Sequence, residues 1–351
     1  MAFVGQEGRV YGREPVEVQL GHVPTLARVT LGRILNDPLR SALEARAAEH
    51  FGRPARIEGL APLLGGASRE LWTFDALVEA ERHELVARRD PEGAEDPDGR
   101  AREAGALAAA ARHGVPVPAL LWCAPDTGLV MQRLQGEARP RRILCEERFA
   151  TARGRLVDEV ARAAAAIHAI PLAELGLRPS SPEESVAALE AELDRIGEPH
   201  PVLELGLRWL RLNLPEPAEP ALVNGDFRLS NWLVDEAGLV AVLDWELCHA
   251  GDPAEDLGWM CIRSWRFGAD ERPAAGLGSR DELLEAYAAA GGREVSRAEL
   301  RFWEAYGNVR WGVICLVQAD LHLSGNLRSL ERAAIGRRTA EPEWDLLAMI
   351  G

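Results

Sequence analysis

The chain has 351 residues, of which 47% are hydrophobic and 27% charged, a composition typical of a soluble globular protein with one large or two modest domains. Its formal net charge of −15 argues against nucleic acid as a partner, because binding to a phosphate backbone needs a basic surface. No apolar run reaches membrane-spanning length, and the N-terminus lacks a basic start followed by an apolar stretch, so we expect no membrane partner, no secretory signal and a cytoplasmic location.

Two residue types set further limits. The five cysteines are scattered without a C-x-x-C pair, so they are interpreted as buried thiols rather than as a disulfide framework or a zinc site. The sequence contains no lysine, and all 40 of its Lys and Arg residues are therefore arginines. Codon usage is the simplest explanation of this bias. It nevertheless means that any cation on bound phosphates has to be an arginine or a metal.

The first 135 residues predict a small sheet with helices beside it. Residues 1–36 carry weak signals, whereas Asp37 and Pro38 predict the N-cap and first turn of a helix that runs to about Phe51. Short apolar runs between turn signals predict strands, and an alanine-rich segment ending at His113 predicts a second helix. The predicted strands are 57–64, 69–76, 83–89, 119–123 and 128–134, and the second helix is 99–113.

The remainder of the chain is predicted to be mostly helical, because apolar residues recur there with helical spacing. The exception is a strand pair around the segment 221–246, which a proline-rich surface loop at 215–220 precedes. The helical patterns cover 155–169, 183–196, 200–213, 252–265, 280–290, 296–322 and 326–336.

The segment 221–246 carries the most informative motif of the chain. Asp226 follows an apolar run and a glycine, Asn231 comes five residues later, and a second apolar run ends at Asp244. This spacing is typical of kinases, in which an aspartate orients the acceptor hydroxyl while an amide and a second carboxylate hold Mg²⁺. Alone, Asp226 is also an ordinary turn residue, and Asp244 is also an ordinary strand-end residue. The combination favours Asp226 as the catalytic residue and Asn231 and Asp244 as metal ligands, with Glu246 as a weaker metal candidate.

With these spacings, the segment resembles the aminoglycoside phosphotransferase-like (choline-kinase-like) small-molecule kinases. Their pattern is His-Gly-Asp-x-x-x-x-Asn, a strand pair, Asp-Trp-Glu and then Gly-Asp-Pro. This chain has Asn224-Gly225-Asp226, Asn231, Asp244-Trp245-Glu246 and Gly251-Asp252-Pro253. It departs from the pattern at Asn224, which stands where the family usually has His and changes how the loop is supported.

The resemblance implies an α+β, two-lobed protein-kinase-like fold. Its small N-lobe would be an antiparallel sheet plus a helix, and its larger C-lobe would be mostly helical and carry the catalytic and metal-binding loops. The chain would then divide into an N-terminal extension and leading helix at 1–55, the N-lobe at 56–133 and the C-lobe at 134–351.

The resemblance also implies a site for ATP between the lobes. Small residues in the Gly65-Gly66-Ala67-Ser68 hairpin would let backbone amides approach the phosphates, although any hairpin can use two glycines. Arg88 would replace the phosphate-pairing lysine. The expected cofactor-binding residues are Gly65, Gly66, Ser68, Arg88, Glu103 and the hinge residues Met131, Gln132 and Arg133, the hinge ending at Leu134 and presenting backbone groups to adenine.

The orientation of Arg88 is open at this point. Strand alternation turns Arg88 and Arg89 to opposite faces of the sheet, and the sequence alone does not say which one faces the cleft. The resemblance favours Arg88, with Glu103 on the following helix as its partner. The alternative is a pair of solvated arginines at the end of a strand.

Four further residues are interpreted as structural. Asp252 and Pro253 predict a helix start, and Asp256 in its first turn is expected to brace the catalytic loop, as its family counterpart does. His168 is expected to be a core histidine rather than a catalytic one.

The acceptor is implied less directly. Arg263, Trp265 and Arg266 follow the metal-binding motif and, if they face the cleft, suit an anionic or acyl-bearing acceptor. The segment also resembles the kinase-like domain fused to some acyl-CoA dehydrogenases, which points to hydroxyacyl substrates. The net acidity of the chain instead favours a cationic acceptor.

The predicted function is an ATP- and Mg²⁺-dependent phosphotransferase that acts on a hydroxyl group of a small molecule. The alternative is a non-catalytic, nucleotide-binding kinase relative with a regulatory or scaffold role. Asn224 and Arg88, in place of the usual His and Lys, support this alternative. The complete set of Asp226, Asn231 and Asp244 argues against it.

Overall fold

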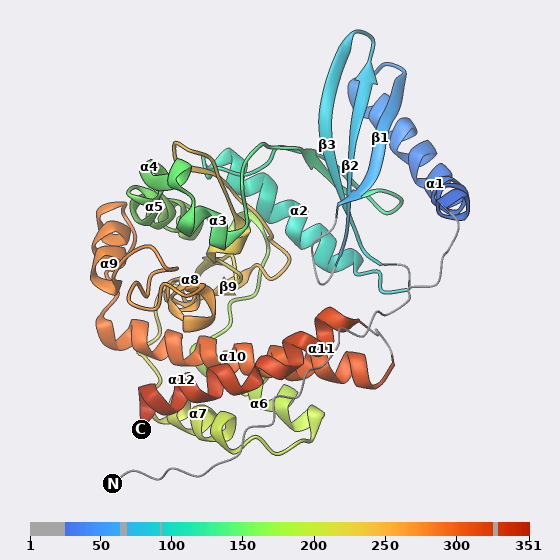
Figure 1. Cartoon of the computed structure of the whole chain (residues 1–351). Coiled ribbons are helices and arrows are strands. Elements are labelled where there is room, and N and C mark those ends of the chain that lie inside the picture. The colour runs from blue at the N-terminus through green and yellow to red at the C-terminus, as the bar shows by residue number, and fades with distance from the viewer. Residues whose placement is uncertain (1–24, 64–68, 92, 326–328) are drawn as a thin grey trace, which may run out of the picture.

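The structure is a computed structural model that describes residues 25–63, 69–91, 93–325 and 329–351, with side chains from residue 38 onwards. Most of its strand residues lie in the first third of the chain, and helices dominate the remainder (Figure 1). The predicted α+β class, with an antiparallel N-terminal sheet and a helical C-terminal part, is confirmed. Within these ranges, every helix is too short or too polar to cross a membrane.

The N-terminal part is a five-stranded antiparallel sheet with the strand order β1-β2-β3-β5-β4. A tight turn joins β2 to β3, because Val78 pairs with Glu81 and Glu79 takes a φ of 54° between them. The two strands therefore extend closer to each other than the sequence predicts. The strands are β1 (Ala55–Leu63), β2 (Glu70–Val78), β3 (Glu81–Arg89), β4 (Leu120–Ala124) and β5 (Gly128–Gln132), and helix α2 (Pro97–Arg112) lies between β3 and β4 in the chain.

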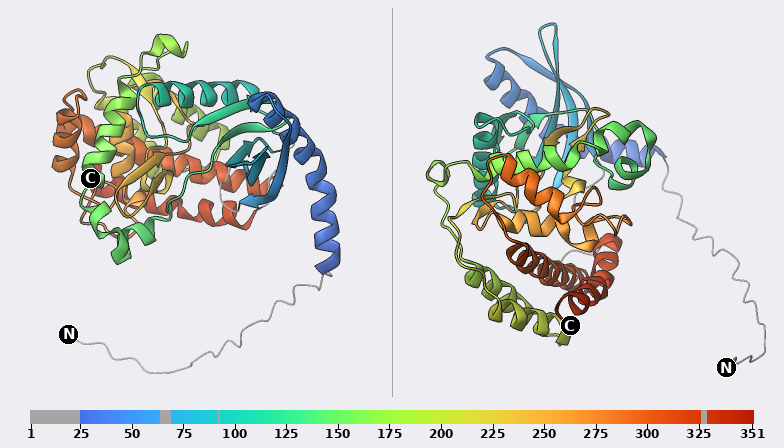
Figure 2. Two further views of the ribbon diagram at one scale, coloured as in Figure 1. Left: turned by 90° about the horizontal axis from the view of Figure 1, so that it is seen from above. Right: turned by 90° about the vertical axis from the view of Figure 1, so that its left-hand side faces the viewer.

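Helix α1 (Thr25–Phe51) begins well before Pro38, so the predicted N-cap at Asp37 was wrong. Pro38 lies inside the helix, where a proline removes one backbone hydrogen bond but does not have to end the helix. Figure 2 shows α1 along the outer side of the sheet. The second half of α1 joins a buried apolar cluster with the sheet, made of Leu39, Leu43, Ala47, Ile57, Leu60, Phe74, Ala76, Leu85, Ala87 and Val130.

The C-terminal part is built around the long helix α10 (Arg297–Leu323), which contacts α6, α7, α8, α11 and α12. Most of the predicted helices are confirmed to within one residue. The short helices α3 and α4 and the last helix α12 were not predicted. The other helices are α3 (Pro140–Cys145), α4 (Ala150–Arg153), α5 (Leu156–His168), α6 (Pro182–Ile196), α7 (Pro201–Leu212), α8 (Ala254–Cys261), α9 (Arg280–Ala289), α11 (Leu330–Gly336) and α12 (Ala340–Ile350).

The segment 252–265, predicted as one helix, is interrupted at Ile262. Helix α8 ends at Cys261, Ile262 is extended with φ −61° and ψ 148°, and a short 3-10 turn follows at Arg263–Trp265. The Arg266 guanidinium donates to the Cys261 carbonyl at 2.7 and 3.1 Å, which satisfies a carbonyl that the broken helix leaves without an intrahelical partner. This contact explains why the chain can turn here.

Two short sheets carry the motif of the segment 221–246. Strand β6 (Ala221–Val223) pairs with β9 (His249–Gly251), and β7 (Trp232–Val234) pairs with β8 (Leu239–Val242). The loop that begins after β6 therefore lies between the two sheets in the chain, and the loop after β8 leads back to β9.

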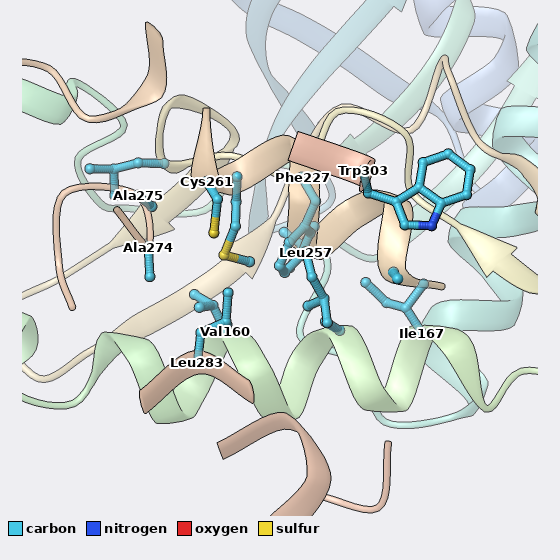
Figure 3. Packing of buried hydrophobic residues seen from close by; sticks show 14 of the residues in the cluster. Val160, Ile167, Phe227, Leu257, Cys261, Ala274, Ala275, Leu283 and Trp303 are labelled. Atoms are coloured by element: carbon cyan, nitrogen blue, oxygen red, sulfur yellow. The ribbon is translucent and has the colours of Figure 1, made fainter. Parts of the chain in front are cut away.

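The segment around Asp226 is anchored in the main hydrophobic core. Val160 and Ile167 on α5 point toward Phe227 and Leu257 (Figure 3), and all four side chains are buried. Phe227 follows Asp226 directly, so its burial fixes the position of this part of the loop.

The cysteine interpretation holds only in part. All five cysteines are free, as expected for a chain without a disulfide framework. Cys248, Cys261 and Cys315 are buried, but Cys123 and Cys145 are exposed, so the prediction of buried thiols was wrong for these two. Both exposed cysteines lie in the middle of the chain, on β4 and at the end of α3.

Candidate active site

Asp226 lies at the start of the loop after β6 and is almost completely buried. Gly225 precedes it with a φ of 81°, and a Cβ at this position would collide with the Leu247 carbonyl. Only glycine combines this backbone conformation with this close approach. The glycine of the Gly-Asp pair in the motif is therefore required by the path of the loop.

Four hydrogen bonds hold the Asp226 carboxylate. Arg228 donates from Nε to Oδ1 at 2.7 Å and from Nη2 to Oδ2 at 3.0 Å. The Trp259 indole N–H donates to Oδ1 at 2.8 Å, and Asn231 Nδ2 donates to Oδ2 at 2.6 Å. Burial by itself would raise the pKa of Asp226, but the charge of Arg228 and the hydrogen bonds from Arg228 and Trp259 lower that pKa below its usual value. The carboxylate is therefore ionised at neutral pH.

Asp256 braces the backbone of this loop from helix α8. Its fully buried carboxylate accepts from the Asn224 amide at 2.8 Å and from the Gly225 amide at 2.9 Å. His168 Nε2 lies 3.1 Å from the same carboxylate, and His168 Nδ1 lies 2.7 Å from the Tyr287 hydroxyl. These contacts match the bracing role predicted for Asp256 and the core position predicted for His168.

Asn224, at the position where the family usually has His, joins the two loops of the site. Its Oδ1 accepts from the Asp226 amide at 3.2 Å, and its Nδ2 donates to the Asp244 carbonyl at 3.3 Å. An amide can do both because it carries an acceptor and two donors on one planar group. Asn224 departs from the family pattern, but its side chain still connects the two loops.

The two candidate metal ligands lie on adjoining backbone segments. The Leu243 amide donates to the Asn231 carbonyl at 2.7 Å, which brings Asp244 beside Asn231. Asp244 takes a left-handed φ of 58°, which is unusual for a non-glycine residue and recurs at functional sites. Asn231 Nδ2 bonds the carbonyl and the carboxylate of Asp226, at 2.9 and 2.6 Å, so its amide oxygen is the atom left for a cation.

This donor set fits Mg²⁺. Mg²⁺ prefers oxygen ligands and commonly takes one or two of them from the protein, with phosphates and waters completing the octahedron. Within the described ranges, no group of three or more His, Cys, Asp or Glu side chains is placed to hold a metal. A site with one amide and one carboxylate agrees with such a cation better than with a metal that needs a closed protein cage.

Arg88 connects the sheet to the C-terminal part. Its guanidinium is buried and pairs with Glu103 of α2, with Asp244 Oδ1 at 2.7 Å and with Glu246 Oε2 at 2.8 Å. Arg89 points the other way, is partly exposed and lies 3.9 Å from Glu70. The structure thus places Arg88, and not Arg89, beside the candidate metal ligands.

A second buried arginine, which the sequence analysis missed, lies in the same cluster. Arg69 Nη1 is 2.7 Å from Glu103 Oε2, and its Nε is 3.5 Å from both Asp90 and Glu246. The signal available in the sequence was its position between the glycine-rich segment and β2. Gly65, Gly66 and Ser68 themselves lie outside the described residues.

The predicted hinge begins in the last residues of strand β5. Strand β5 ends at Gln132, and the Gln132 amide donates to the Ala119 carbonyl at 2.9 Å. The Arg133 amide donates to the Glu84 carbonyl at 2.9 Å, while its guanidinium pairs with Asp75 at 3.0 Å and with Glu84. These two amides therefore form hydrogen bonds within the N-terminal part, and the expectation that the hinge at 131–134 presents backbone groups to adenine stays a prediction.

The three weak substrate candidates have different environments. Arg263 is half exposed and pairs with Asp270 at 2.7 Å. Arg266 is mostly buried and pairs with Glu304 at 2.9 Å, in addition to its bonds with the Cys261 carbonyl. The sequence analysis assigned the arginines to the substrate only if they face the cleft, and Arg266 does not meet that condition, because Glu304 neutralises its charge inside the protein.

Trp265 is buried and contacts the site through Arg228. The Arg228 guanidinium carbon lies 4.1 Å from the centre of the Trp265 ring, a cation–π contact. Close by along the chain, a groove of about 570 Å³ opens between α12, the start of α3 and the turn at 263–270. It is lined by Arg141, Arg263, Ser264, Phe267, Gly268, Asp270, Arg338, Glu341, Trp344 and Asp345.

The chain is similar to known proteins in sequence. The model of the phosphotransferase enzyme family matches residues 60–303, which is more than half of the chain. The chain is 31% identical over 191 residues to acyl-CoA dehydrogenase family member 11 of Gallus gallus, covering 50% of this chain and 24% of the relative. It is 44% identical over 64 residues to acyl-CoA dehydrogenase family member 10 of Mus musculus, covering 18% of this chain and 6% of the relative. The chain thus corresponds to a minor part of these longer relatives.

The fold is also similar to solved structures. One is described as an aminoglycoside phosphotransferase from Ralstonia eutropha, with a TM-score of 0.67, 23% identity and coverage of 87% of this chain and 97% of the other. Another is the macrolide 2′-phosphotransferase MphH from Brachybacterium faecium, with a TM-score of 0.58, 23% identity and coverage of 86% and 97%. A third is a thermostable mutant of aminoglycoside phosphotransferase APH(4)-Ia in complex with AMP-PNP and hygromycin B, with a TM-score of 0.59, 17% identity and coverage of 88% and 99%. By the match of its family model and by this fold, the chain belongs to the phosphotransferase enzyme family.

Proposed function

We propose that the protein transfers the γ-phosphoryl group of ATP to a hydroxyl group of a small molecule, with Mg²⁺ as the metal. The observation that carries this proposal is the convergence of Asp226, Asn231 and Asp244 with the buried Arg88, which comes from a different part of the fold. Phosphoryl transfer depends mainly on positioning and on stabilising the charge of the phosphates, and these residue types supply both.

Asp226 is the residue that orients the acceptor hydroxyl. Both of its carboxylate oxygens already accept hydrogen bonds, so an incoming hydroxyl has to displace one donor. Arg228 is the donor that can leave, because it is partly exposed and an arriving phosphate offers its guanidinium a bidentate partner. Release of Arg228 would then free Asp226 for the hydroxyl.

The nucleotide contacts follow from the charged cluster at the sheet. Asn231 and Asp244 would hold Mg²⁺, which when bound neutralises charge on the phosphate oxygens. Arg88 now pairs with Asp244 and Glu246 and would exchange one of these carboxylates for a phosphate. Arg69, buried against Glu103, would supply a second positive charge from the same side.

The acceptor class is suggested by the relatives rather than by local charge. The groove at the turn 263–270 is lined by three arginines and three carboxylates, so its net charge favours neither a cationic nor an anionic acceptor. The relatives in sequence are acyl-CoA dehydrogenase family members, and this favours a hydroxyl on an acyl chain. The solved relative APH(4)-Ia is bound to hygromycin B, which keeps aminoglycosides among the compounds to be tested.

One observation favours the alternative of a non-catalytic nucleotide-binding protein. The Asp226 carboxylate is bonded to Arg228, Trp259 and Asn231, which is also how a purely structural carboxylate would be satisfied. The alternative predicts that ATP binds with Mg²⁺ and that Arg228 keeps its contact with Asp226 in the bound state.

The test is a panel of hydroxylated compounds, including hydroxyacyl thioesters and aminoglycosides, assayed for ATP- and Mg²⁺-dependent phosphorylation. The expected result is a phosphorylated product with one acceptor class, absent with Asp226→Asn. Binding of Mg-ATP by calorimetry without turnover on any acceptor would support the non-catalytic alternative. Absence of Mg-ATP binding would contradict both.

A further inference from the structure

Helix α8 holds the catalytic loop in two ways. Asp256 and Trp259 are three residues apart on this helix and therefore lie on the same face. Asp256 accepts from the backbone amides of Asn224 and Gly225, whereas Trp259 donates its indole N–H to Asp226 Oδ1 at 2.8 Å. One helix face thus fixes both the backbone of the loop and the orientation of its carboxylate.

Trp259 differs from the other two donors to Asp226. Arg228 is a charged, partly exposed side chain that can change partners, and Asn231 is a candidate metal ligand. Trp259 is buried and uncharged, and its only donor group is the indole N–H. Of the three side chains, it is the one with no other ligand to bind when a nucleotide arrives.

The indole ring is held in place by its neighbours. The Trp259 and Trp265 rings lie 5.3 Å apart between centroids, and the Arg310 guanidinium carbon lies 4.7 Å from the Trp259 ring centre. Gly307 of α10 lies beside the ring, since a Cβ there would be 3.4 Å from Trp259 Cε3, about van der Waals contact. A side chain packed in this way has little freedom to rotate, so its N–H presents a fixed direction to the carboxylate.

We propose that Trp259 is a positioning residue for phosphoryl transfer, keeping the Asp226 carboxylate oriented while Arg228 exchanges that carboxylate for phosphate. The inference rests on the proposed function, because it assigns Trp259 a role in the same reaction. It goes beyond a packing role, since the indole ring would fill the same space without its N–H.

The experiment distinguishes the contribution of the Trp259 indole N–H from that of the packed ring. Trp259→Phe keeps an aromatic ring but removes the donor, and replacement of Trp259 by 3-benzothienylalanine keeps the bicyclic shape and removes only the N–H. The matched control is Trp311→Phe in the same aromatic cluster, because the Trp311 indole N–H is buried without a hydrogen-bond partner in the described part of the chain.

With the acceptor found in the panel, both Trp259 replacements are expected to lower kcat roughly 10- to 100-fold, as small misplacements of a catalytic group do. The KM for ATP should stay within about 2-fold, because Trp259 does not face the phosphate cations. Trp311→Phe should change kcat by less than about 2-fold. Equal losses in the Trp259 and Trp311 variants, or a loss confined to KM, would overturn the proposal.

A second readout does not depend on turnover. The Trp259 indole N–H resonance, assigned among the ten tryptophans by its loss in Trp259→Phe, is expected to move upfield in Asp226→Ala, while the Trp311 resonance stays in place. An unmoved Trp259 resonance would show that the contact is absent in solution and overturn the proposal even in an active enzyme. A wild-type protein that makes the contact but phosphorylates no acceptor would overturn the proposed function, and the role of Trp259 with it.

Discussion

The two sides of the candidate site are held by different kinds of interaction. Beside the sheet, the buried side chains of Arg69 and Arg88 share the carboxylates of Glu103 and Glu246, and Arg88 also pairs with Asp244. At the catalytic loop, α8 fixes the chain by directional hydrogen bonds between a carboxylate and N–H groups. An arginine with several carboxylate partners can exchange one for a phosphate at small cost, whereas the loop cannot give up its amide bonds without unfolding. The proposed nucleotide side is therefore adaptable, and the proposed catalytic side is preorganised.

The largest expected effect is on kcat and comes from replacing Asp226, the residue proposed to orient the acceptor hydroxyl. Asp226→Asn should lower kcat by about 10²- to 10⁴-fold, because the variant cannot take the proton or orient the hydroxyl as a carboxylate does. ATP affinity should remain within about 2-fold, since Asp226 is not a phosphate-binding group. Steady-state kinetics and calorimetry measure the two quantities. An unchanged kcat would remove Asp226 from the reaction.

Asp256→Ala should lower the stability of the folded protein rather than act on the chemical step directly. It leaves the buried amides of Asn224 and Gly225 without their acceptor, so the free energy of unfolding should fall by about 3 kcal/mol. Urea denaturation measures the change. The control is Asp270→Ala, which removes an exposed partner of Arg263 and should cost less than about 1 kcal/mol. Similar losses in both variants would mean that Asp256 does not brace the loop.

Substitutions of Arg88, the cation at the proposed nucleotide side, should lower kcat/KM for ATP in graded steps. Arg88→Ala is expected to weaken kcat/KM for ATP by roughly 10- to 100-fold, since hydrogen bonds to charged groups contribute about 1.5–3 kcal/mol. Arg88→Lys should restore part of this loss, because an ammonium supplies the charge without the fork geometry. Arg89→Ala is the matched control and should be close to neutral, as its side chain faces away from the cluster. The reverse order of effects would contradict the placement of Arg88 at the phosphates.

The same comparison explains what the sequence could and could not predict. The spacing of Asp226, Asn231 and Asp244 is local, and the short strands between them bring the three together, so the motif was visible. The role of Trp259 was hidden, because it depends on how α8 docks against the loop 33 residues earlier in the chain.

The partners of charged side chains were harder to predict than the helices and strands. Arg266 carried a plausible signal for substrate binding, but its partner Glu304 is 38 residues away, and a sequence does not show which charges neutralise one another. Arg69 was missed for the same reason, because its burial arises only when the sheet, α2 and the loop after β8 meet. The nucleotide, metal and acceptor roles of all these residues remain predictions.

The smallest expected effect concerns pH and the strand that supports the catalytic loop. His249 on β9, which pairs with β6, lies 3.1 Å from Glu255 through Nε2 and 3.0 Å from the Leu247 carbonyl through Nδ1. Burial by itself would lower the pKa of His249, but the buried Glu255 carboxylate outweighs burial and the charge of Arg310 and raises that pKa to about 9.

Since the folded pKa of His249 lies above the usual value of 6.5, protonated His249 stabilises the folded state most fully below pH 6.5. That contribution is lost as the pH rises toward about 9, because the imidazole then loses the proton that pairs with Glu255. The imidazole is 31% exposed, so we expect solvent screening to limit the loss to about 1 to 2 kcal/mol. Urea denaturation between pH 6 and pH 9.5 should show this decline in the wild type and a smaller one in His249→Gln, which lacks the titrating group. Parallel curves for the two proteins would show that the His249–Glu255 pair does not support the strand under the catalytic loop, leaving α8 as its main support.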